Sequence, residues 1–384
     1  MADAYDVVVV GAGSVGTPAA LALAEAGARV LVVDERRGVG QGSNKAAIGG
    51  VRATHSDPAK IALGLRSLEV FRTWKERRGD DLEWRTGGYV FAAWRDKDAA
   101  TLRALSVTQR SLGLDVRWLD APALLEVVPD LARDGLLGGT FSPGDGHCSP
   151  LLAIEAMRRA AERAGATFRF GEPALGIDRD GPREIAVRTP RGAIATTAVV
   201  LAAGATAPAI PAAWGEALSV RPDAHEAGIT EPVAPFLAPL VVDIRPGPGS
   251  ANVYFYQHAT GQVVFCLTPA PLAWGDDTRE TSAFLPAVAR RMIAAMPRLA
   301  SIRVRRTWRG LYPMTPDGMP LVGFSRALEN VFIAAGMCGQ GFMLGPAVGE
   351  LAARAVLGGA TEGDRAILAQ LSPWRSFGAA EKLK

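Results

Sequence analysis

The stretch Asp6-Val-Val-Val-Val-Gly-Ala-Gly-Ser-Val-Gly16 decides the fold of this 384-residue chain. Its β-branched run, bounded by glycine, is typical of a buried parallel strand, and the Ala- and Leu-rich residues Thr17–Ala26 predict a helix. Residues Arg29–Val33 predict a second strand, which Asp34 closes. A strand, a Gly-x-Gly-x-x-Gly turn, a helix, a strand and an acidic residue within about thirty residues form the fingerprint of a dinucleotide-binding βαβ unit.

Each glycine of the turn has a physical role. Gly11 permits the tight bend, Gly13 lets a pyrophosphate approach the backbone, and Gly16 lets the helix pack closely on the strand. The helix N-terminus offers unpaired N–H groups and a positive dipole end to phosphate, and Asp34 can accept hydrogen bonds from ribose hydroxyls. An ordinary βαβ packing turn is the alternative. We therefore expect cofactor contacts from Gly11, Gly13, Ser14, Val15, Gly16, Asp34, Glu35 and Arg36.

Residues 42–52, Gly-Ser-Asn-Lys-Ala-Ala-Ile-Gly-Gly-Val-Arg, follow the second strand and are mostly small or polar. Such a loop predicts a second contact surface for the cofactor, with Gly42, Ser43 and Asn44 at its start. The fingerprint alone does not distinguish FAD from NAD.

A second glycine-rich junction lies near the other end of the chain. Val199–Gly204 and Asn330–Gly336 are apolar runs that each stop at a glycine, as strands that end beneath a cofactor do. More glycines follow the second run, and Ala347–Leu357 predicts a helix with Pro346 near its first turn. An ordinary glycine loop is the alternative to a second cofactor-binding junction.

The remaining segments have a different sequence pattern from the two glycine-rich junctions. Turn residues separate short apolar runs, which predict strands at Gly87–Ala93, Leu240–Ile244, Asn252–Gln257 and Gln262–Leu267. Two further segments predict helices, Arg103–Leu112 and Ala283–Ala295. We take residues 86–147 and 219–309 as one substrate domain, inserted twice into a discontinuous nucleotide-binding domain made of residues 1–85, 148–218 and 310–384.

Composition excludes several classes of protein. Apolar residues make up 48% of the chain and charged residues 21%, with 43 Gly and 26 Pro, which excludes a disordered chain, collagen and a coiled coil. A net charge of +3 gives no sign of a nucleic-acid partner. The three cysteines are far apart and lack metal-ligand spacing, so we expect neither disulfides nor a metal site. No apolar stretch reaches the roughly 20 residues of a membrane helix, and no basic segment precedes the first apolar run, so we expect a cytoplasmic protein without a signal peptide.

The sequence resembles the flavoproteins of the D-amino-acid-oxidase superfamily. Four blocks carry the resemblance: residues 6–52, Ala198–Gly204, Trp308–Asp317 and Gly336–Pro346. It is most similar to the branch of glycine oxidase, monomeric sarcosine oxidase, and the beta subunits of heteromeric sarcosine oxidase and proline dehydrogenase. The resemblance implies an α/β fold, in which a Rossmann-like FAD-binding domain of the glutathione-reductase type carries an inserted α+β substrate domain built on a mostly antiparallel sheet.

The same resemblance implies FAD as the cofactor. The far glycine junction would fold back beside the first one, so that its backbone N–H groups and helix dipole face the flavin pyrimidine edge and stabilise negative charge there. The residues implied are Ala203, Gly204, Gly336, Gly339, Gln340, Gly341, Phe342 and Met343. Gly310 aligns with the cysteine that carries flavin covalently in monomeric sarcosine oxidase, so we expect noncovalent FAD.

Five residues are candidates for the substrate site. Arg52 matches the arginine that holds the substrate carboxylate in the related enzymes, and its planar fork suits a carboxylate; a surface or phosphate-facing arginine is the alternative. Tyr312 falls where the sarcosine oxidases have an active-site tyrosine, and a tyrosine packed under the flavin is the alternative there. Tyr254, Tyr256 and His258 lie on or just after a predicted strand and are candidate pocket residues, with a packed aromatic strand as the alternative.

The reaction implied is hydride transfer from the carbon beside an amine nitrogen to flavin N5, which gives an imine that water hydrolyses. The substrate is then an amino acid or secondary amine resembling sarcosine, glycine or proline. No residue stands out as an obligatory base.

The distribution of lysine bears on the electron acceptor, which is oxygen, a quinone or a partner protein. No lysine occurs between Asp98 and Glu381. Sarcosine oxidases have an oxygen-activating lysine in the stretch that matches Val263–Thr268, and monomeric sarcosine oxidase has a carboxylate-binding lysine where this chain has Met343. A fixed cation stabilises developing superoxide, so its absence predicts a dehydrogenase or a sluggish oxidase.

Two other functions remain open. A 2-hydroxy-acid or glycerol-phosphate-type dehydrogenase shares the fold and requires a base near the substrate hydroxyl, for which His258 is the candidate. The resemblance to beta subunits also allows a flavin-binding subunit of a hetero-oligomeric dehydrogenase complex.

Overall fold

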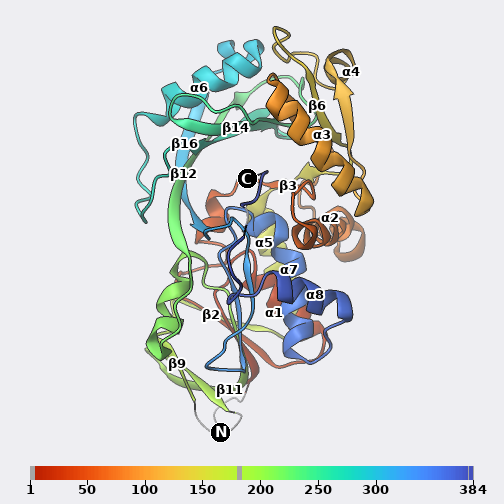
Figure 1. Ribbon diagram of the computed structural model, residues 1–384. Coiled ribbons are helices and arrows are strands. Elements are labelled where there is room, and N and C mark those ends of the chain that lie inside the picture. Colours follow the sequence, from red (N-terminus) through yellow and green to blue (C-terminus); the bar gives the residue numbers. More distant parts are fainter. Residues whose placement is uncertain (1–4, 180–183, 379, 384) are drawn as a thin grey trace.

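The computed structural model describes residues 5–179, 184–378 and 380–383, which form two halves, one above the other (Figure 1). Each half is built on its own eight-stranded sheet. A separate two-stranded sheet is formed by β3 (Gly50–Val51) and β7 (Gly146–His147). No helix in the described part of the chain is long and apolar enough to cross a bilayer.

The sheet of the lower half is mainly parallel. Its central strand β1 pairs in parallel with β2 on one side and β11 on the other, so that Val7 lies opposite both Val30 and Ala198. In spatial order the strands are β17 (Leu321–Phe324), β18 (Val331–Ala335), β11 (Gly192–Leu201), β1 (Tyr5–Val10), β2 (Val30–Asp34) and β8 (Thr167–Phe170), with β10 (Ile185–Thr189) on β11 and β9 (Gly176–Arg179) on β10.

Both faces of this sheet are covered, which explains its nearly continuous apolar strands. On one face β1 and β2 pack against a layer of helices: α1 (Gly16–Glu25), α2 (Pro58–Arg78), α5 (Pro150–Arg163) and α7 (Gly341–Val356), with α8 (Glu362–Gln370) outside α2. The opposite face packs against β9, β10 and the short 3-10 helices η2 (Gly204–Ala209) and η3 (Pro211–Trp214). The arrangement confirms the predicted Rossmann-like domain.

Helix α2 shows how local signals set the limits of an element that the sequence analysis did not predict. Asp57 caps the N-terminus by accepting a hydrogen bond from the backbone N–H of Lys60, and Pro58 occupies the first turn. Gly79 ends the helix in the left-handed conformation, with φ 85°.

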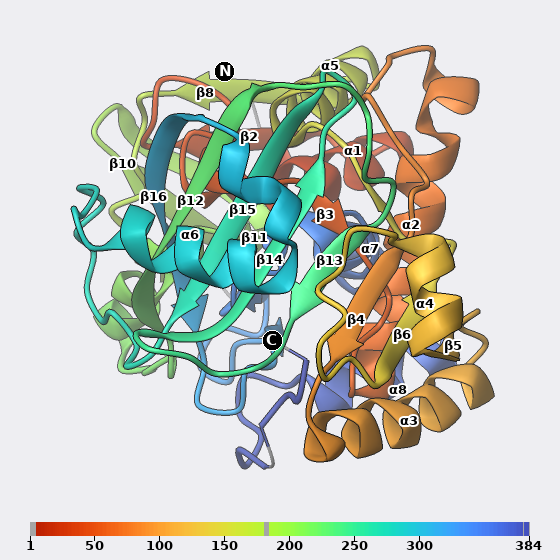
Figure 2. The same ribbon diagram turned by 90° about the horizontal axis from the view of Figure 1, so that it is seen from above.

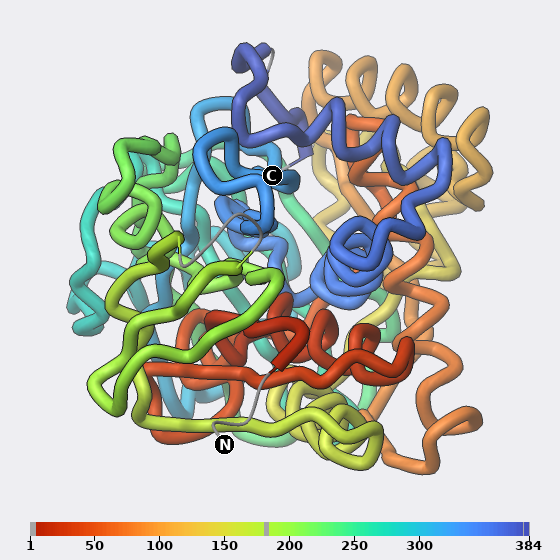
Figure 3. The backbone as a smooth tube through the Cα atoms, turned by 90° about the horizontal axis from the view of Figure 1, so that it is seen from below, coloured from red at the N-terminus to blue at the C-terminus, as the bar shows by residue number. Residues whose placement is uncertain are grey.

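The two glycine junctions lie against each other. A Cβ at Gly345 of α7 would overlap the backbone oxygen of Ser14, and a Cβ at Gly349 would lie 2.8 Å from the backbone carbon of Pro18 in α1. In the view from below, the red N-terminal segments and the blue C-terminal helix run side by side (Figure 3). Glycine is therefore required where α1 and α7 touch backbone to backbone.

Helix α7 begins earlier than predicted, at Gly341 instead of Ala347, so that Pro346 lies inside it. Proline has no N–H, so the helix lacks one backbone hydrogen bond at Pro346, and the next N–H, that of Ala347, donates to the hydroxyl of Ser67 at 3.2 Å.

The sheet of the upper half is antiparallel except for the parallel pair β4–β13. In spatial order its strands are β16 (Val304–Met314), β12 (Arg221–Pro232), β15 (Gln262–Pro269), β14 (Ser250–Gln257), β13 (Leu240–Asp243), β4 (Tyr89–Ala93), β6 (Gly138–Ser142) and β5 (Arg117–Asp120). This mostly antiparallel sheet confirms the predicted class of the inserted part.

Helices cover the outer face of the upper sheet. Seen from above, α6 (Phe284–Ala295) crosses β14 and β15 (Figure 2), and α4 (Ala121–Val127) and η4 (Pro297–Ser301) complete the layer. The inner face packs partly on α3 (Asp96–Ser111) and otherwise faces the lower half. The long strands β12 and β16 were not predicted, and β16 continues past the predicted domain boundary at residue 310, since Gly310 lies within the strand and pairs with His225.

Candidate active site

A cavity of about 500 Å³ lies where the carboxyl ends of β1, β2, β11 and β18 meet the inner face of the upper sheet. This is the edge at which open α/β sheets bind their ligands. Most of the predicted cofactor residues line it: Gly11, Gly13, Ser14, Val15, Asp34, Glu35, Arg36, Gly42, Ser43, Asn44, Ala203, Gly204, Gly336, Gly339, Gly341, Phe342 and Met343. Gly16 and Gln340 are not among the lining residues; a Cβ at Gly16 would overlap the carbonyl oxygen of Gly11, which fits its predicted packing role.

Asp34 braces the first glycine turn. One carboxylate oxygen accepts a hydrogen bond from the backbone N–H of Ala12 at 2.6 Å, and the other accepts from the N–H of Arg36 at 2.7 Å. Burial raises the pKa of Asp34, partly offset by these two hydrogen bonds. The carboxylate thus holds the turn in shape at the tip of β2, where it also reaches the cavity.

The loop after β2 is fixed by side-chain contacts. Its short 3-10 helix η1 (Ser43–Ala46) carries Asn44, which accepts a hydrogen bond from the Ser14 hydroxyl at 2.7 Å and donates one to the backbone oxygen of Pro150 at 3.1 Å. The loop is therefore tied both to the glycine turn and to the start of α5.

The cavity wall fits a bound FAD. Gly13, Gly42 and Gly204 line the cavity, and a Cβ built on any of them meets no protein atom within 4 Å, so each bare backbone faces open space. A wall of bare backbone next to a helix N-terminus suits a pyrophosphate. The residues present thus match the needs of the dinucleotide that the sequence implies.

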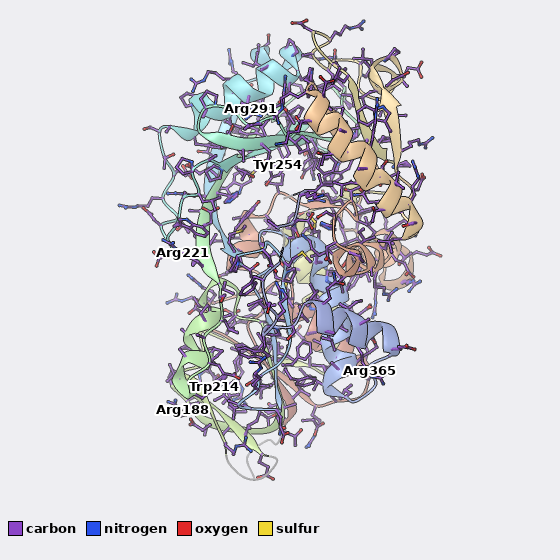
Figure 4. All side chains as sticks on the ribbon, in the orientation of Figure 1. Arg188, Trp214, Arg221, Tyr254, Arg291 and Arg365 are labelled. Carbon is purple, nitrogen blue, oxygen red and sulfur yellow. The ribbon has the colours of Figure 1, made fainter. Side chains whose placement is uncertain are left out.

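At the far junction the cavity is bounded by Tyr312 of β16. A Cβ at Gly339 would overlap the Tyr312 ring, so the ring lies directly on the glycine turn. The hydroxyls of Tyr312 and Tyr254 are 2.8 Å apart, and the Cys266 thiol lines the same region. Figure 4 shows Tyr254 on the inner side of the upper sheet, toward the lower half. Burial raises the pKa of both tyrosines, which keeps them protonated as hydrogen-bond donors.

A histidine that sequence analysis missed completes this cluster. The ring of His225 on β12 stacks on Tyr312, with centroids 3.8 Å apart, and lines the cavity. Its Nε2 is 2.7 Å from the carboxylate of Asp223, two residues back on the same face of the strand. The pattern Asp-x-His in a strand is the signal that finds this pair, but it could not be used because β12 itself was not predicted.

Arg52 lies in a different setting from the one expected. Its side chain is buried and is not among the cavity-lining residues. The guanidinium donates to the backbone oxygens of Thr54 and Leu383, the latter at 2.6 Å, and lies 3.3 Å from His55 Nδ1. The role of Arg52 in binding a substrate carboxylate stays a prediction, and it requires the guanidinium to exchange one of these carbonyls for substrate.

Tyr256 and His258 also lie outside the cavity lining. The Tyr256 hydroxyl donates to the backbone oxygen of Ile48, and its ring is 4.2 Å from that of His147. His258 Nε2 is 3.3 Å from the Glu83 carboxylate, and its Nδ1 is 2.7 Å from the Thr260 hydroxyl. Both side chains therefore support the loop and strand ends around the site, and their roles in catalysis stay untested predictions.

Residues 380–383 pass between the two halves (Figure 1). Leu383 packs into the apolar cluster on the inner face of the upper sheet, and Glu381 forms a buried ion pair with Lys60 at 2.8 Å. No local pattern in the sequence predicts this contact, because it joins residues more than three hundred positions apart.

Two observations bear on the cofactor linkage and on charge. A Cβ at Gly310 would overlap the Cβ of Ala46, so this position is tightly packed. On the inner face of β15, Cys266 lines the cavity. Among the described residues that line the cavity, Lys45 on η1 is the only lysine.

Fold and cavity together define a flavin-dependent oxidoreductase. The family model described as "FAD dependent oxidoreductase" matches residues 6–355. Glycine oxidase of Geobacillus kaustophilus is 29% identical over 360 residues, 92% of this chain and 93% of the relative. Sarcosine oxidase subunit beta of Rhizobium meliloti is 26% identical over 373 residues, 93% of this chain and 86% of the relative. The crystal structure of L-proline dehydrogenase from P. horikoshii matches with a TM-score of 0.89 and 28% identity, covering 98% of each chain.

The chain belongs to this family of D-amino-acid-oxidase-like FAD-dependent oxidoreductases. The resemblance seen in its sequence is confirmed, as are FAD as its cofactor and its class as an amine or amino-acid oxidoreductase.

Proposed function

We propose that this chain oxidises the C–N bond of an amino acid or secondary amine resembling sarcosine, glycine or proline. The observation that carries the proposal is that one cavity brings the backbone cradle together with Tyr254, Tyr312 and His225. Bound FAD supplies the acceptor for the hydride that leaves the carbon beside nitrogen. The resulting imine is hydrolysed by water.

The residues of the chain orient the substrate and limit the water around it. The two tyrosine hydroxyls share one hydrogen bond, and both also hydrogen-bond the Cys266 thiol, so a substrate carboxylate or nitrogen accepts the second hydroxyl proton in place of the weakly accepting sulfur. Trp308 of the upper sheet and Ile48, in the loop between η1 and β3, line the cavity together with the tyrosines, and these apolar side chains limit the water that reaches this end of it.

Anaerobic bleaching of the flavin tests the proposal. The panel contains both enantiomers of the amino acids, N-methyl amino acids, proline and 2-hydroxy acids, each added to oxygen-free holoenzyme. We expect amines to discharge the yellow absorbance of the oxidised flavin, and a panel in which no amine does so overturns the proposal.

A 2-hydroxy-acid dehydrogenase is the second candidate. Oxidation of an alcohol requires a base, and His225 supplies an imidazole in the cavity where the sequence had offered only His258. Bleaching by hydroxy acids and not by amines would favour this function.

We further propose noncovalent FAD, a cytoplasmic location and assembly with other subunits. Tight packing at Gly310 supports the first, and the buried thiols Cys148 and Cys266 support a reducing compartment. The relative named sarcosine oxidase subunit beta supports the third. Acid precipitation should leave the flavin in the supernatant, and size measurement of the protein expressed alone and with neighbouring gene products tests the assembly.

A further inference from the structure

Residues 380–383 form a strap that passes between the two halves of the molecule (Figure 1). Near its start, the carboxylate of Glu381 pairs with Lys60 and accepts hydrogen bonds from the hydroxyl and the backbone N–H of Ser56. At its end, Leu383 packs into the apolar cluster on the inner face of the upper sheet. The strap therefore joins the start of α2 to the upper sheet.

The strap covers two cations and satisfies them differently. Arg52 is 5% exposed and Lys60 is fully buried. Lys60 receives the strap's carboxylate, whereas Arg52 receives the neutral carbonyl of Leu383 at 2.6 Å. Among the described residues, the other hydrogen-bond partners of Arg52 are the Thr54 carbonyl and the His55 ring, so its fork holds no carboxylate. A buried cation whose hydrogen-bond partners are all neutral is one that an anion would stabilise.

The covered cations lie beside the cavity. Leu383 shares its apolar cluster with Ile48, Tyr89 and Tyr254, and all three of these residues line the cavity. Arg52 and Leu383 do not line it. Displacement of the strap would therefore extend the cavity toward Arg52.

The attachment of the strap lets it leave as a unit. Upstream of it, the Arg375 guanidinium is anchored on the Asp317 carboxylate and on the backbone oxygens of Pro320 and Leu371. Residues 376–378, between this anchor and the strap, are exposed. A change of backbone direction there releases the strap and leaves the Arg375 anchor in place.

We propose that residues 380–383 are an autoinhibitory strap, which the carboxylate of an amino-acid substrate displaces from Arg52. A carboxylate fills a guanidinium fork with two charge-assisted hydrogen bonds, whereas the Leu383 carbonyl is one neutral acceptor. Water enters the space that the strap leaves and hydrates Lys60, so its charge does not stay buried without a partner. This inference rests on the proposed oxidation of an amino acid, and it names the contact that regulates access to that site.

Alternate binding of the strap and the substrate by Arg52 has a distinctive consequence. Substitution of Arg52 weakens both contacts, so the KM of the full chain changes little. Without the strap, the same substitution weakens only the contact with substrate, and KM rises. A strap that merely supports the fold predicts no such dependence.

Deletion of residues 379–384 tests this consequence in the FAD-loaded enzyme. We expect the deletion to lower the KM for a carboxylated substrate at least about tenfold, with kcat within about threefold of wild type. Arg52→Lys should raise KM at least about tenfold in the deleted chain, against no more than about threefold in the full chain. Lys382→Gln changes an exposed side chain of the strap and is the matched control. A deleted chain whose KM equals or exceeds that of the wild type overturns the proposal.

A fluorine label observes the strap directly and requires neither turnover nor the deletion. Cys148, Cys266 and Cys338 are buried, so Lys382→Cys supplies an exposed thiol for a trifluoromethyl label. The Leu383→Ser form of the labelled protein, which lacks the apolar anchor, gives the reference signal of the released strap.

The probes for the labelled holoenzyme are 2-methylalanine and tert-butylamine. Neither has a hydrogen on the carbon beside nitrogen, and they differ in that a methyl group replaces the carboxylate. We expect 2-methylalanine to move the 19F signal toward the released reference and tert-butylamine to leave it in place. A signal that 2-methylalanine does not move, up to its solubility limit, overturns the proposal.

The outcomes separate this inference from the proposed function. If no amine bleaches the wild-type flavin, amine oxidation fails and the inference fails with it. If amines bleach the wild type, but the deletion leaves KM unchanged or the 19F signal stays in place, only the inference fails.

Discussion

The ammonium of Lys60 and the carboxylate of Glu381 lie 2.8 Å apart, and neither side chain is exposed to solvent. The same carboxylate accepts hydrogen bonds from the backbone N–H groups of Ser56, at 2.9 Å, and Leu383, at 3.0 Å. This pair joins the start of α2 to residues 380–383, and the backbone carbonyl of Leu383 in the same segment accepts a hydrogen bond from Arg52.

Neutralising Glu381 should destabilise the protein strongly. Glu381→Gln leaves the Lys60 charge buried without its partner, and we expect the free energy of unfolding to fall by about 3–5 kcal/mol. Urea denaturation of the holoenzyme measures it. Lys382→Gln changes the neighbouring exposed charge and should stay within about 0.5 kcal/mol of wild type. Equal losses in the two variants would contradict the expectation.

The pair also predicts an acid dependence of stability. Burial alone would raise the pKa of Glu381, but the Lys60 charge and the hydrogen bonds lower it from 4.5 to about 2. A carboxyl with a lowered folded pKa stabilises the protein above the unfolded pKa, and the contribution is lost as pH falls from about 4.5 through about 2. Below about pH 4.5 the free energy of unfolding of the wild type should therefore fall relative to that of the Lys60→Met/Glu381→Leu double variant. A pH-independent gap between pH 7 and 3 would be inconsistent with a charged pair.

Two neighbouring glycines should respond differently to alanine. A Cβ at Gly13 meets no protein atom, so Gly13→Ala should fold with nearly wild-type stability but bind FAD at least about tenfold more weakly. A Cβ at Gly16 would overlap the Gly11 oxygen, so Gly16→Ala should destabilise the apoprotein by about 1–3 kcal/mol. Flavin content and apoprotein unfolding measure the two effects. Normal FAD binding by Gly13→Ala would refute the placement of the pyrophosphate.

Arg52 should act mainly as an anchor. Lysine at this position cannot bridge the Thr54 and Leu383 oxygens as a planar fork does, so Arg52→Lys should cost about 1–3 kcal/mol of stability. The KM for an amino acid should change by no more than about threefold. An amine without a carboxylate provides the comparison: a KM that rises only for the carboxylated substrate would restore the carboxylate-binding role.

The reduced protein should react slowly with oxygen. Cys266 occupies the inner face of β15 where a cation would promote the reaction, so we expect a soluble quinone to reoxidise the flavin roughly 100-fold faster than dissolved oxygen. Stopped-flow mixing of reduced holoenzyme with each oxidant decides this. Lys45→Met measures what the lysine on η1 contributes to any oxygen reaction that remains.

Local patterns predicted the cofactor half of this structure well. The valines of β1, the glycine turn and Asp34 lie within one short segment of the chain. The contacts that they make with one another can therefore be predicted from local sequence patterns. The same holds for Val331–Ala335 and the glycines after it, although Pro346 suggested too late a start for α7.

The substrate side depended on contacts between distant segments. Arg52 was placed by its position in a motif, but its partners Thr54 and Leu383 come from opposite ends of the chain. Asp223 and His225 were missed because β12 does not alternate between apolar and polar residues, which is the pattern that predicts a half-exposed strand. Both faces of β12 are buried over most of its length, and polar residues occur among the buried positions.

The backbone contact between Gly345 of α7 and Ser14, two residues before α1, ties α7 to the start of the first helix of the lower half. During synthesis α1 leaves the ribosome more than three hundred residues before α7, so the part of α1 that packs on α7 has no partner for most of translation, although α5 is available earlier. The lower half therefore completes its core only after release of residues 331–356, and the upper half is available to fold first. Chaperone dependence of the nascent chain should accordingly depend on α7, not on the substrate sheet.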